Sequence, residues 1–108
     1  MVTLKRDRYI AFKILSESNK IKESSLKLSV WDTYKTLFGI SESSGSGLYF
    51  ENYNDVTKLG IVRCNHKALV QILTVLAILT RIDRDEILIQ IINVSGTINK
   101  AKKSLVTK

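Results

Sequence analysis

An apolar helical segment between two strand-like runs constrains the fold more than any other feature of this sequence. Residues 68–79 contain only two polar side chains, Gln71 and Thr74, and the surrounding segment 66–80 is predicted to be helical. Residues 59–64 precede it and residues 86–94 follow it, and both runs have the composition of strands. A helix with so few polar positions is expected to be buried on more than one side. The pattern therefore predicts a strand-helix-strand unit.

A further strand-like run lies near the start of the chain. Residues 8–15 alternate between two faces: one carries Ile10, Phe12 and Ile14, and the other carries Tyr9, Ala11 and Lys13. Alternation with a period of two is typical of a strand with one buried face. The run therefore predicts a first strand that is half-buried.

Polar and small residues after this strand indicate a helix and then a loop. Apolar side chains recur at helical spacing over residues 26–38, and Ser24 or Ser25 is predicted to cap this helix. Gly39 is predicted to end it, since glycine readily adopts the conformation found just after helices. The following run, SESSGSG in residues 41–47, predicts a flexible loop outside any packed element.

The remaining segments complete two strand-helix-strand halves. Residues 48–53 and 59–64 flank the turn sequence NDVTK, which predicts a hairpin. Residues 83–85 turn into the strand 86–94, and a terminal helix is predicted over residues 98–106. Two such halves predict an α/β (α+β) fold, the ferredoxin-like split β-α-β sandwich, with a four-stranded antiparallel sheet, helices on one face and an extra C-terminal helix. At 108 residues the chain is expected to form this single domain.

The predicted last strand is apolar on both faces. Ile87, Ile89 and Ile91 line one face, and Leu88, Gln90 and Ile92 line the other. Apolar side chains on the outer face stay in water unless something covers them. Either the terminal helix packs over Leu88 and Ile92 or a partner protein binds them, and so short a chain has little length left for the first arrangement.

The net charge indicates the class of partner. Seventeen Lys and Arg against ten Asp and Glu give a formal charge of +7, which attracts a polyanion whatever its sequence. Basic residues crowd both ends of the chain: Lys5, Arg6, Arg8, Lys100, Lys102, Lys103 and Lys108. Nucleic acid is therefore favoured over the alternative of a basic domain whose charge serves only solubility.

The first of two junctions between a strand and a helix is basic. Arg63, His66 and Lys67 lie there, and Asn65 is predicted to cap a helix whose free N–H groups face an anion. These residues are candidates for contacts with phosphate. For His66 alone, the favoured alternative is an exposed side chain at a capping turn without any ligand.

The second junction, VSGTINKAKK, joins the last strand to the terminal helix. Gly96 is predicted to take a positive φ, and Thr97 is predicted to be an N-cap. Lys100, Lys102 and Lys103 follow at once, so the same turn is also a candidate phosphate site.

The sequence disfavours base stacking in the manner of an RNA-recognition domain. Such a domain carries aromatic side chains on its third strand, and the corresponding run here, GIVRCNH, contains none. Tyr9, Tyr49 and Tyr53 remain as isolated aromatic platforms.

Catalysis by the protein itself is also disfavoured. The sequence has one histidine and no Gly-rich phosphate loop, metal-ligand cluster or nucleophile-base pair. A closed zinc site needs four ligands, and Cys64 with His66 supplies at most two. Cys64 is instead predicted to be a small buried hydrophobe. No secretory signal or membrane-spanning segment is recognised, which predicts a cytoplasmic protein.

Three blocks of the sequence resemble a known family. RYIAFKI near the start, GIVRCNHKAL in the middle and VSGTINKAKK near the end are similar to the protein component 2 family of archaeal-type ribonuclease P. The blocks occur in the order and spacing of that family, and the resemblance spans nearly the whole chain.

The resemblance implies a ferredoxin-like subunit of the ribonucleoprotein that removes 5′ leaders from precursor tRNA. In that family the RNA and its magnesium ions are the catalyst, so we expect no catalytic residue and no cofactor bound by the protein. The implied partners are the ribonuclease P RNA, protein component 3, with which the subunit can form a heterotetramer, and precursor tRNA indirectly. The residues expected to contact RNA are Arg6, Arg8, Arg63, His66, Lys67, Lys100, Lys102 and Lys103.

Two functions from other classes remain as alternatives. The first is a protein-interaction module of another RNA-containing assembly, which holds a partner subunit without contacting RNA. The second is a small acylphosphatase-like hydrolase, which requires an arginine and an asparagine around a phosphate loop, and the sequence shows no such loop.

Overall fold

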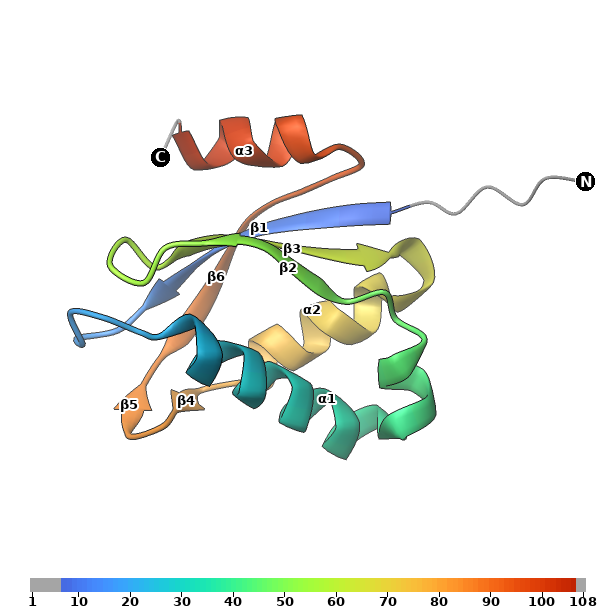
Figure 1. Ribbon diagram of the computed structural model, residues 1–108, viewed down its shortest axis with the longest axis horizontal. Helices are drawn as coiled ribbons and strands as arrows, with labels where there is room; N and C mark the ends of the chain where they lie inside the picture. The colour runs from blue at the N-terminus through green and yellow to red at the C-terminus, as the bar shows by residue number, and fades with distance from the viewer. Residues whose placement is uncertain (1–6, 107–108) are drawn as a thin grey trace, which may run out of the picture.

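Four strands form one antiparallel sheet between two helical layers. The computed structural model describes residues 7–106. The sheet strands are β1 (Asp7–Leu15), β2 (Tyr49–Tyr53), β3 (Leu59–Asn65) and β6 (Leu88–Ser95), in the spatial order β2-β3-β1-β6. The helices are α1 (Glu23–Ser44), the 3₁₀ turn η1 (His66–Ala68), α2 (Leu69–Ile78) and α3 (Ile98–Val106). Helices α1 and α2 lie on one face and α3 on the other (Figure 1). This arrangement confirms the predicted ferredoxin-like sandwich with its extra C-terminal helix.

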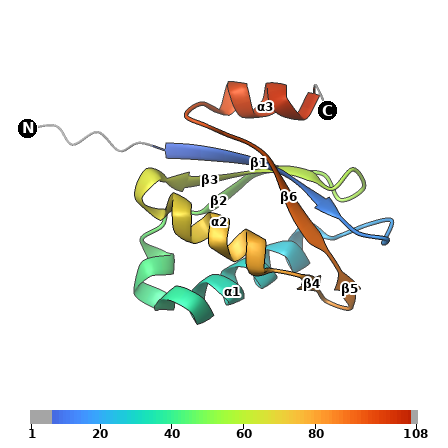
Figure 2. The same ribbon diagram turned by 180° about the vertical axis from the view of Figure 1, so that it is seen from behind.

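The two faces of β1 enter two different cores. The main core beneath α1 and α2 takes every second side chain of the strand: Ile10, Phe12 and Ile14. On the opposite face Ala11 is fully buried in a smaller cluster with Ile61 of β3 and Ala101 of α3. Figure 2 shows α3 lying along this second face. The predicted alternation is confirmed. The second face, which carries Tyr9, Ala11 and Lys13, is also partly covered, by α3.

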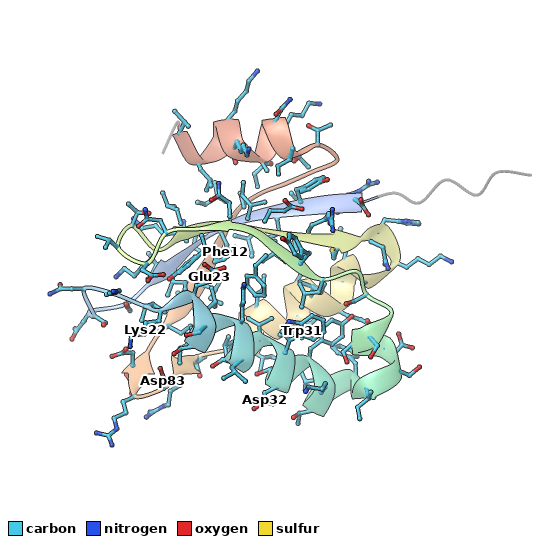
Figure 3. The ribbon with its side chains drawn as sticks, in the orientation of Figure 1. Phe12, Lys22, Glu23, Trp31, Asp32 and Asp83 are labelled. Carbon is cyan, nitrogen blue, oxygen red and sulfur yellow. The ribbon has the colours of Figure 1, made fainter. Side chains whose placement is uncertain are left out.

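The start of α1 differs from the prediction. Neither Ser24 nor Ser25 caps the helix, which begins at Glu23 with Lys22 in the N-cap position and no side-chain cap. The Glu23 N–H donates instead to Oδ1 of Asp55, 3.2 Å away, in the β2–β3 turn. Figure 3 labels Lys22 and Glu23 at this end of α1. A carboxylate near a helix N-terminus is favourable whichever segment supplies it, so a tertiary contact replaces the local cap.

The segment 41–47 is packed, and its prediction as a flexible loop is wrong. Gly39, with φ 89°, kinks α1 without ending it, because the helix resumes beyond the kink. Ser43 and Ser46 are buried, and the Ser46 hydroxyl donates to the Ser43 carbonyl at 2.7 Å. The Asn65 N–H at the end of β3 donates to the Ser46 carbonyl at 2.9 Å. Hydrogen bonds to a strand therefore order a segment whose composition is typical of a linker.

Helix α2 is buried on one side only, so the prediction of burial on more than one side is also wrong. Ile72, Val75 and Leu76 are buried against the core, whereas Val70 is 74% exposed and Ile78 is 50% exposed. Only the sheet and α1 flank this helix, and a chain of this length supplies no further layer. No helix within residues 7–106 is long and apolar enough to cross a membrane.

The strand predicted over residues 86–94 is shorter and is preceded by a separate small hairpin. Strands β4 (Arg81–Ile82) and β5 (Asp85–Glu86) pair with each other around Asp83, which has φ 55°. Figure 3 labels Asp83 at this turn. Strand β6 then begins at Leu88.

A bulge divides β6 into two parts. Ile91 pairs with Phe12 and Asn93 pairs with Ala11, so Ile92 is an extra residue between two paired positions of β1. Because a bulge shifts the pairing by one residue, the simple alternation predicted for this strand does not continue past Ile92.

Candidate nucleic-acid interface

The strand register gathers basic residues at one edge of the sheet. Strand β1 begins where β3 and β6 end: Arg8 pairs with Cys64, and Tyr9 pairs with both Arg63 and Ser95. Turn η1 follows β3 directly and α3 follows β6 after a short turn, so both helical segments begin at this edge (Figure 1). We define the junction edge as residues 8, 9, 49, 63–67 and 96–100. The two basic junctions, separated by some thirty residues of sequence, therefore lie at the same edge.

Arg63 is held by two side chains of β2. Its Nη1 lies 3.3 Å from Oε1 of Glu51, and its guanidinium carbon lies 5.1 Å from the centre of the Tyr49 ring. The Glu51 carboxylate offsets part of the arginine charge. An ion pair with partly exposed side chains adds little stability by itself, but together with the ring it orients the guanidinium. Arg63 is thus less available to a phosphate than an arginine without an acidic neighbour.

Tyr49, which the sequence suggested only as an isolated aromatic platform and not as part of the RNA-contact set, lies at this edge beside Arg63. The signal was present in the alternation of residues 48–53, because Leu48 and Phe50 are buried and Tyr49 between them points outward. Its contact with Arg63 depends on how two strands are aligned, which local sequence does not specify.

Arg8 lies beside the turn that leads into α3. Its Nη1 donates to the Asp7 carbonyl at 3.0 Å and lies 3.8 Å from the position that a Cβ on Gly96 would occupy. Gly96 is not among the positive-φ glycines of the described residues, so that prediction is wrong. A Cβ at this position would make only an ordinary contact with Arg8, so the structure gives no steric reason for glycine here.

Helix α3 presents its lysines to solvent on two flanks. The Lys100 N–H donates to Oγ1 of Thr97 at 3.3 Å, which confirms Thr97 as the cap. Ala101 is fully buried against the sheet. With 100° between successive residues, Lys100 and Lys103 fall on one flank and Lys102 on the other. All three lysines are exposed.

His66 and Lys67 are exposed on η1, and Asn65 has a structural role between β3 and this turn. Asn65 Oδ1 accepts a hydrogen bond from the Ala68 N–H at 3.0 Å, which confirms the predicted cap. Its Nδ2 donates to the Gly45 carbonyl at 2.8 Å. Both polar groups of the Asn65 side chain are therefore engaged in hydrogen bonds within the chain.

A shallow cavity of about 210 Å³ adjoins Lys67. Its wall also includes Glu42, whose Oε2 accepts a hydrogen bond from Gln71 Nε2 at 3.4 Å, and the Gln71 Oε1 accepts from the Tyr34 hydroxyl at 2.6 Å. Because an acid and its hydrogen-bonded neighbour face the cavity, it does not favour an anion. Lys67 is therefore more available to a phosphate on the side that faces solvent than on the side that faces the cavity.

Cys64 belongs to the junction edge, but its side chain faces the main core. It is fully buried, and burial, followed by the nearby Asp7 charge, raises the pKa of the thiol to about 11. The prediction that Cys64 is a small buried hydrophobe is confirmed. Within residues 7–106, no three potential metal-ligating side chains of the His, Cys, Asp or Glu type lie together.

The predicted RNA-contact set is only partly brought together. Arg8, Arg63, His66, Lys67 and Lys100 lie at the junction edge, whereas Lys102 and Lys103 lie further along α3. Arg6 lies outside the described residues.

The two predicted partner-contact residues have different surroundings. Ile92 packs against the cluster beneath α3. Of the two alternatives for this residue, cover by the terminal helix is therefore the correct one. Leu88 is 55% exposed, and α3 does not cover it. The sequence missed the exposed apolar side chains on the helical side, Val70 and Ile78.

Comparison with known proteins adds a sequence relationship over the same residues. Residues 8–106 match the model of the Rpp14/Pop5 family. The chain is 36% identical to "Ribonuclease P protein component 2" of Archaeoglobus fulgidus, over 91% of this chain and 86% of that protein. It is 25% identical to the protein of the same name from Pyrococcus furiosus, over 95% of this chain and 85% of that protein.

A solved structure has the same fold. A chain in the cryo-EM structure of yeast ribonuclease MRP superposes with a TM-score of 0.72 at 16% identity, covering 99% of this chain and 96% of that one. At this identity the likeness concerns the fold alone. The family match, which includes the whole junction edge, establishes the relationship: this chain belongs to the Rpp14/Pop5 family.

Proposed function

We propose that this chain is a protein subunit of ribonuclease P, the ribonucleoprotein that removes 5′ leaders from precursor tRNA. The observation that carries the proposal is the family match over residues 8–106. Its curated relatives bear the name ribonuclease P protein component 2, and the chain covers 85% to 86% of the length of two of them.

In this proposal the subunit supports the RNA and takes no part in the cleavage chemistry. Its basic side chains neutralise phosphates of the ribonuclease P RNA, and that RNA with its bound magnesium ions is the catalyst. We place the assembly in the cytoplasm. The net charge of +7 supports this role, since each neutralised phosphate releases counterions. The junction edge supports it further, because three different elements, β1, η1 and α3, each place a basic residue there: Arg8, Lys67 and Lys100.

The test is reconstitution of precursor-tRNA cleavage with and without the subunit, at low and at high magnesium. The subunit is expected to be required at low magnesium and dispensable at high magnesium, because cationic side chains and magnesium screen the same phosphates. A subunit that changes cleavage at neither magnesium concentration would contradict the proposal.

A second surface of the same subunit is proposed to bind protein component 3, in a pair that assembles into a heterotetramer. Its support is an exposed apolar pair on the sheet, Leu88 of β6 opposite Leu15 of β1, which are 55% and 39% exposed. Exposed apolar patches of this kind are typical of protein interfaces. If the chain bound component 3 but gave no crosslinks to RNA, the alternative of a protein-interaction module would replace the RNA-contacting role.

A further inference from the structure

Tyr49 presents an aromatic ring to solvent in a position that the hydrophobic cores do not explain. The ring is 55% exposed and belongs to neither core cluster, whereas the next residue, Phe50, is buried in the main core. Packing therefore gives no reason for an aromatic side chain at this position. The exposed ring is therefore available to a ligand at this end of the sheet.

The surroundings of Tyr49 fix the direction in which its ring faces. The guanidinium carbon of Arg63 lies over the ring, 5.1 Å from its centre, and Nη1 of Arg63 lies 3.3 Å from Oε1 of Glu51. A cation over an aromatic ring is attracted by the electrons of that ring. Arg63 also pairs across the sheet with Tyr9, so Tyr49, Arg63 and Tyr9 form a cross-strand row. Tyr9 packs against the cluster beneath α3, so Tyr49 and Arg63 are the exposed members of the row.

The charges of this row favour a flat neutral ligand over a phosphate. The Glu51 side chain is 19% exposed, and its carboxylate offsets the charge of Arg63. A phosphate would therefore gain little electrostatic attraction from Arg63. A nucleobase presents an uncharged π face, and unpaired bases stack on aromatic rings and on guanidinium planes. The backbone phosphates on either side of such a base would have Arg8 and Lys100 at the same edge of the sheet.

We propose that Tyr49, oriented by Arg63 and Glu51, stacks on an unpaired nucleobase of the RNA. This inference rests on the proposed function, because it names the part of the RNA that the junction edge reads. It also revises the role of Arg63, which positions the ring in addition to any contact of its own with the RNA.

The experiment measures binding of transcribed ribonuclease P RNA by the wild-type chain and by Tyr49→Leu, Tyr49→Phe and Tyr49→Trp, over a range of salt concentrations. Tyr49→Leu is expected to weaken binding about tenfold, within the range found for loss of one stacked base. Tyr49→Phe and Tyr49→Trp keep a ring and are expected to bind nearly as tightly as the wild type. The salt dependence should stay unchanged in all three variants, since no phosphate contact is lost.

A second measurement locates the contact directly. Ultraviolet crosslinking to the same RNA containing 4-thiouridine, followed by mass spectrometry, is expected to yield a crosslinked peptide containing Tyr49. Thermal unfolding of each variant serves as the folding control, and Val56→Ala at the exposed tip of the β2–β3 hairpin is the matched surface variant.

The outcomes separate this inference from the proposed function. If the wild type binds the RNA and Tyr49→Leu binds equally well, the platform is excluded and the RNA-binding role stands. If Tyr49→Leu keeps RNA binding but loses protein component 3, the row is a protein interface and the inference is overturned. If the wild type does not bind the RNA at all, the RNA-contacting role fails together with the platform.

Discussion

Gly60 of β3 lies opposite Phe12 of β1 and directly against its ring, so that a Cβ on Gly60 would stand 2.7 Å from Phe12 Cζ. The same Cβ would lie 2.9 Å from the Asn52 carbonyl oxygen and 2.9 Å from Tyr53 Cδ1. Phe12 and Tyr53 are themselves stacked, with ring centres 6.2 Å apart. The glycine is therefore what allows these two rings to meet over the inner strand β3.

Gly60→Ala is expected to lower the free energy of unfolding by about 1 to 3 kcal/mol, the usual cost of overpacking a core. Backbone is among the atoms that would clash, so the side chains cannot relieve the contact by themselves. Urea denaturation measures the change. Gly96→Ala is the control, since its Cβ would meet only Arg8 Nη1, at 3.8 Å, and equal losses in the two variants would contradict the packing argument.

Cys64 is expected to make stability fall at alkaline pH. The thiol ionises at its ordinary pKa of 9.0 in the unfolded chain and at about 11 in the folded chain, because burial disfavours the thiolate. Its contribution is complete below the unfolded pKa, because the unfolded chain loses the proton first as the pH rises, and it is lost progressively up to the folded pKa.

Urea denaturation of the wild type and of Cys64→Ala at several pH values between these two pKa values tests this expectation. The variant is less stable at neutral pH through lost packing, but its stability should fall less steeply with pH. Part of the slope should remain, since burial also raises the pKa of Tyr53, to about 12. Parallel pH profiles for the two proteins would show that the Cys64 thiol does not titrate as described.

Replacement of Lys100, Lys102 and Lys103 together by alanine is expected to reduce the salt dependence of RNA binding. Each phosphate contact contributes about 0.7 to 0.9 to the log-log slope of affinity against salt. Because Lys102 lies on the opposite flank of α3 from the other two, Lys102→Ala alone tests whether one flank or both face the RNA. Lys35→Ala on α1 is the control, as an exposed lysine on the other side of the sheet. An unchanged slope in the triple variant would exclude these lysines from phosphate contact.

Leu88→Asp is expected to weaken binding of protein component 3 at least tenfold, which is about 1.4 kcal/mol, because a carboxylate would be buried at the interface. RNA affinity should not fall beyond the small effect of one added negative charge. Isothermal titration calorimetry with component 3 measures the effect, with Val56→Asp as a matched exposed site on a different edge. Equal affinity for Leu88→Asp and the wild type would remove Leu88 from the partner surface.

Short-range patterns in the sequence determined the order of the elements and the faces of β1. The alternation of Ile10, Phe12 and Ile14 identified a half-buried strand, and the caps at Asn65 and Thr97 were readable because each side chain bonds an N–H three residues away. The three sequence blocks also indicated the family that the comparison over residues 8–106 establishes. All of these features depend on residues close together in the chain.

Only the tertiary structure decided how distant segments meet. Asp55 supplies the contact at the start of α1, and the Asn65 backbone orders the serine-rich segment through Ser46. The partners of Arg63 come from another strand, and their alignment places Tyr49 beside it. The sequence by itself thus determined which residues of β1 point to which face and which family the chain resembles. The register of the sheet decided which basic residues share an edge, and the limited chain length decided which faces are covered. Neither can be read from the sequence, because hydrogen bonds and packing between distant elements follow no local period.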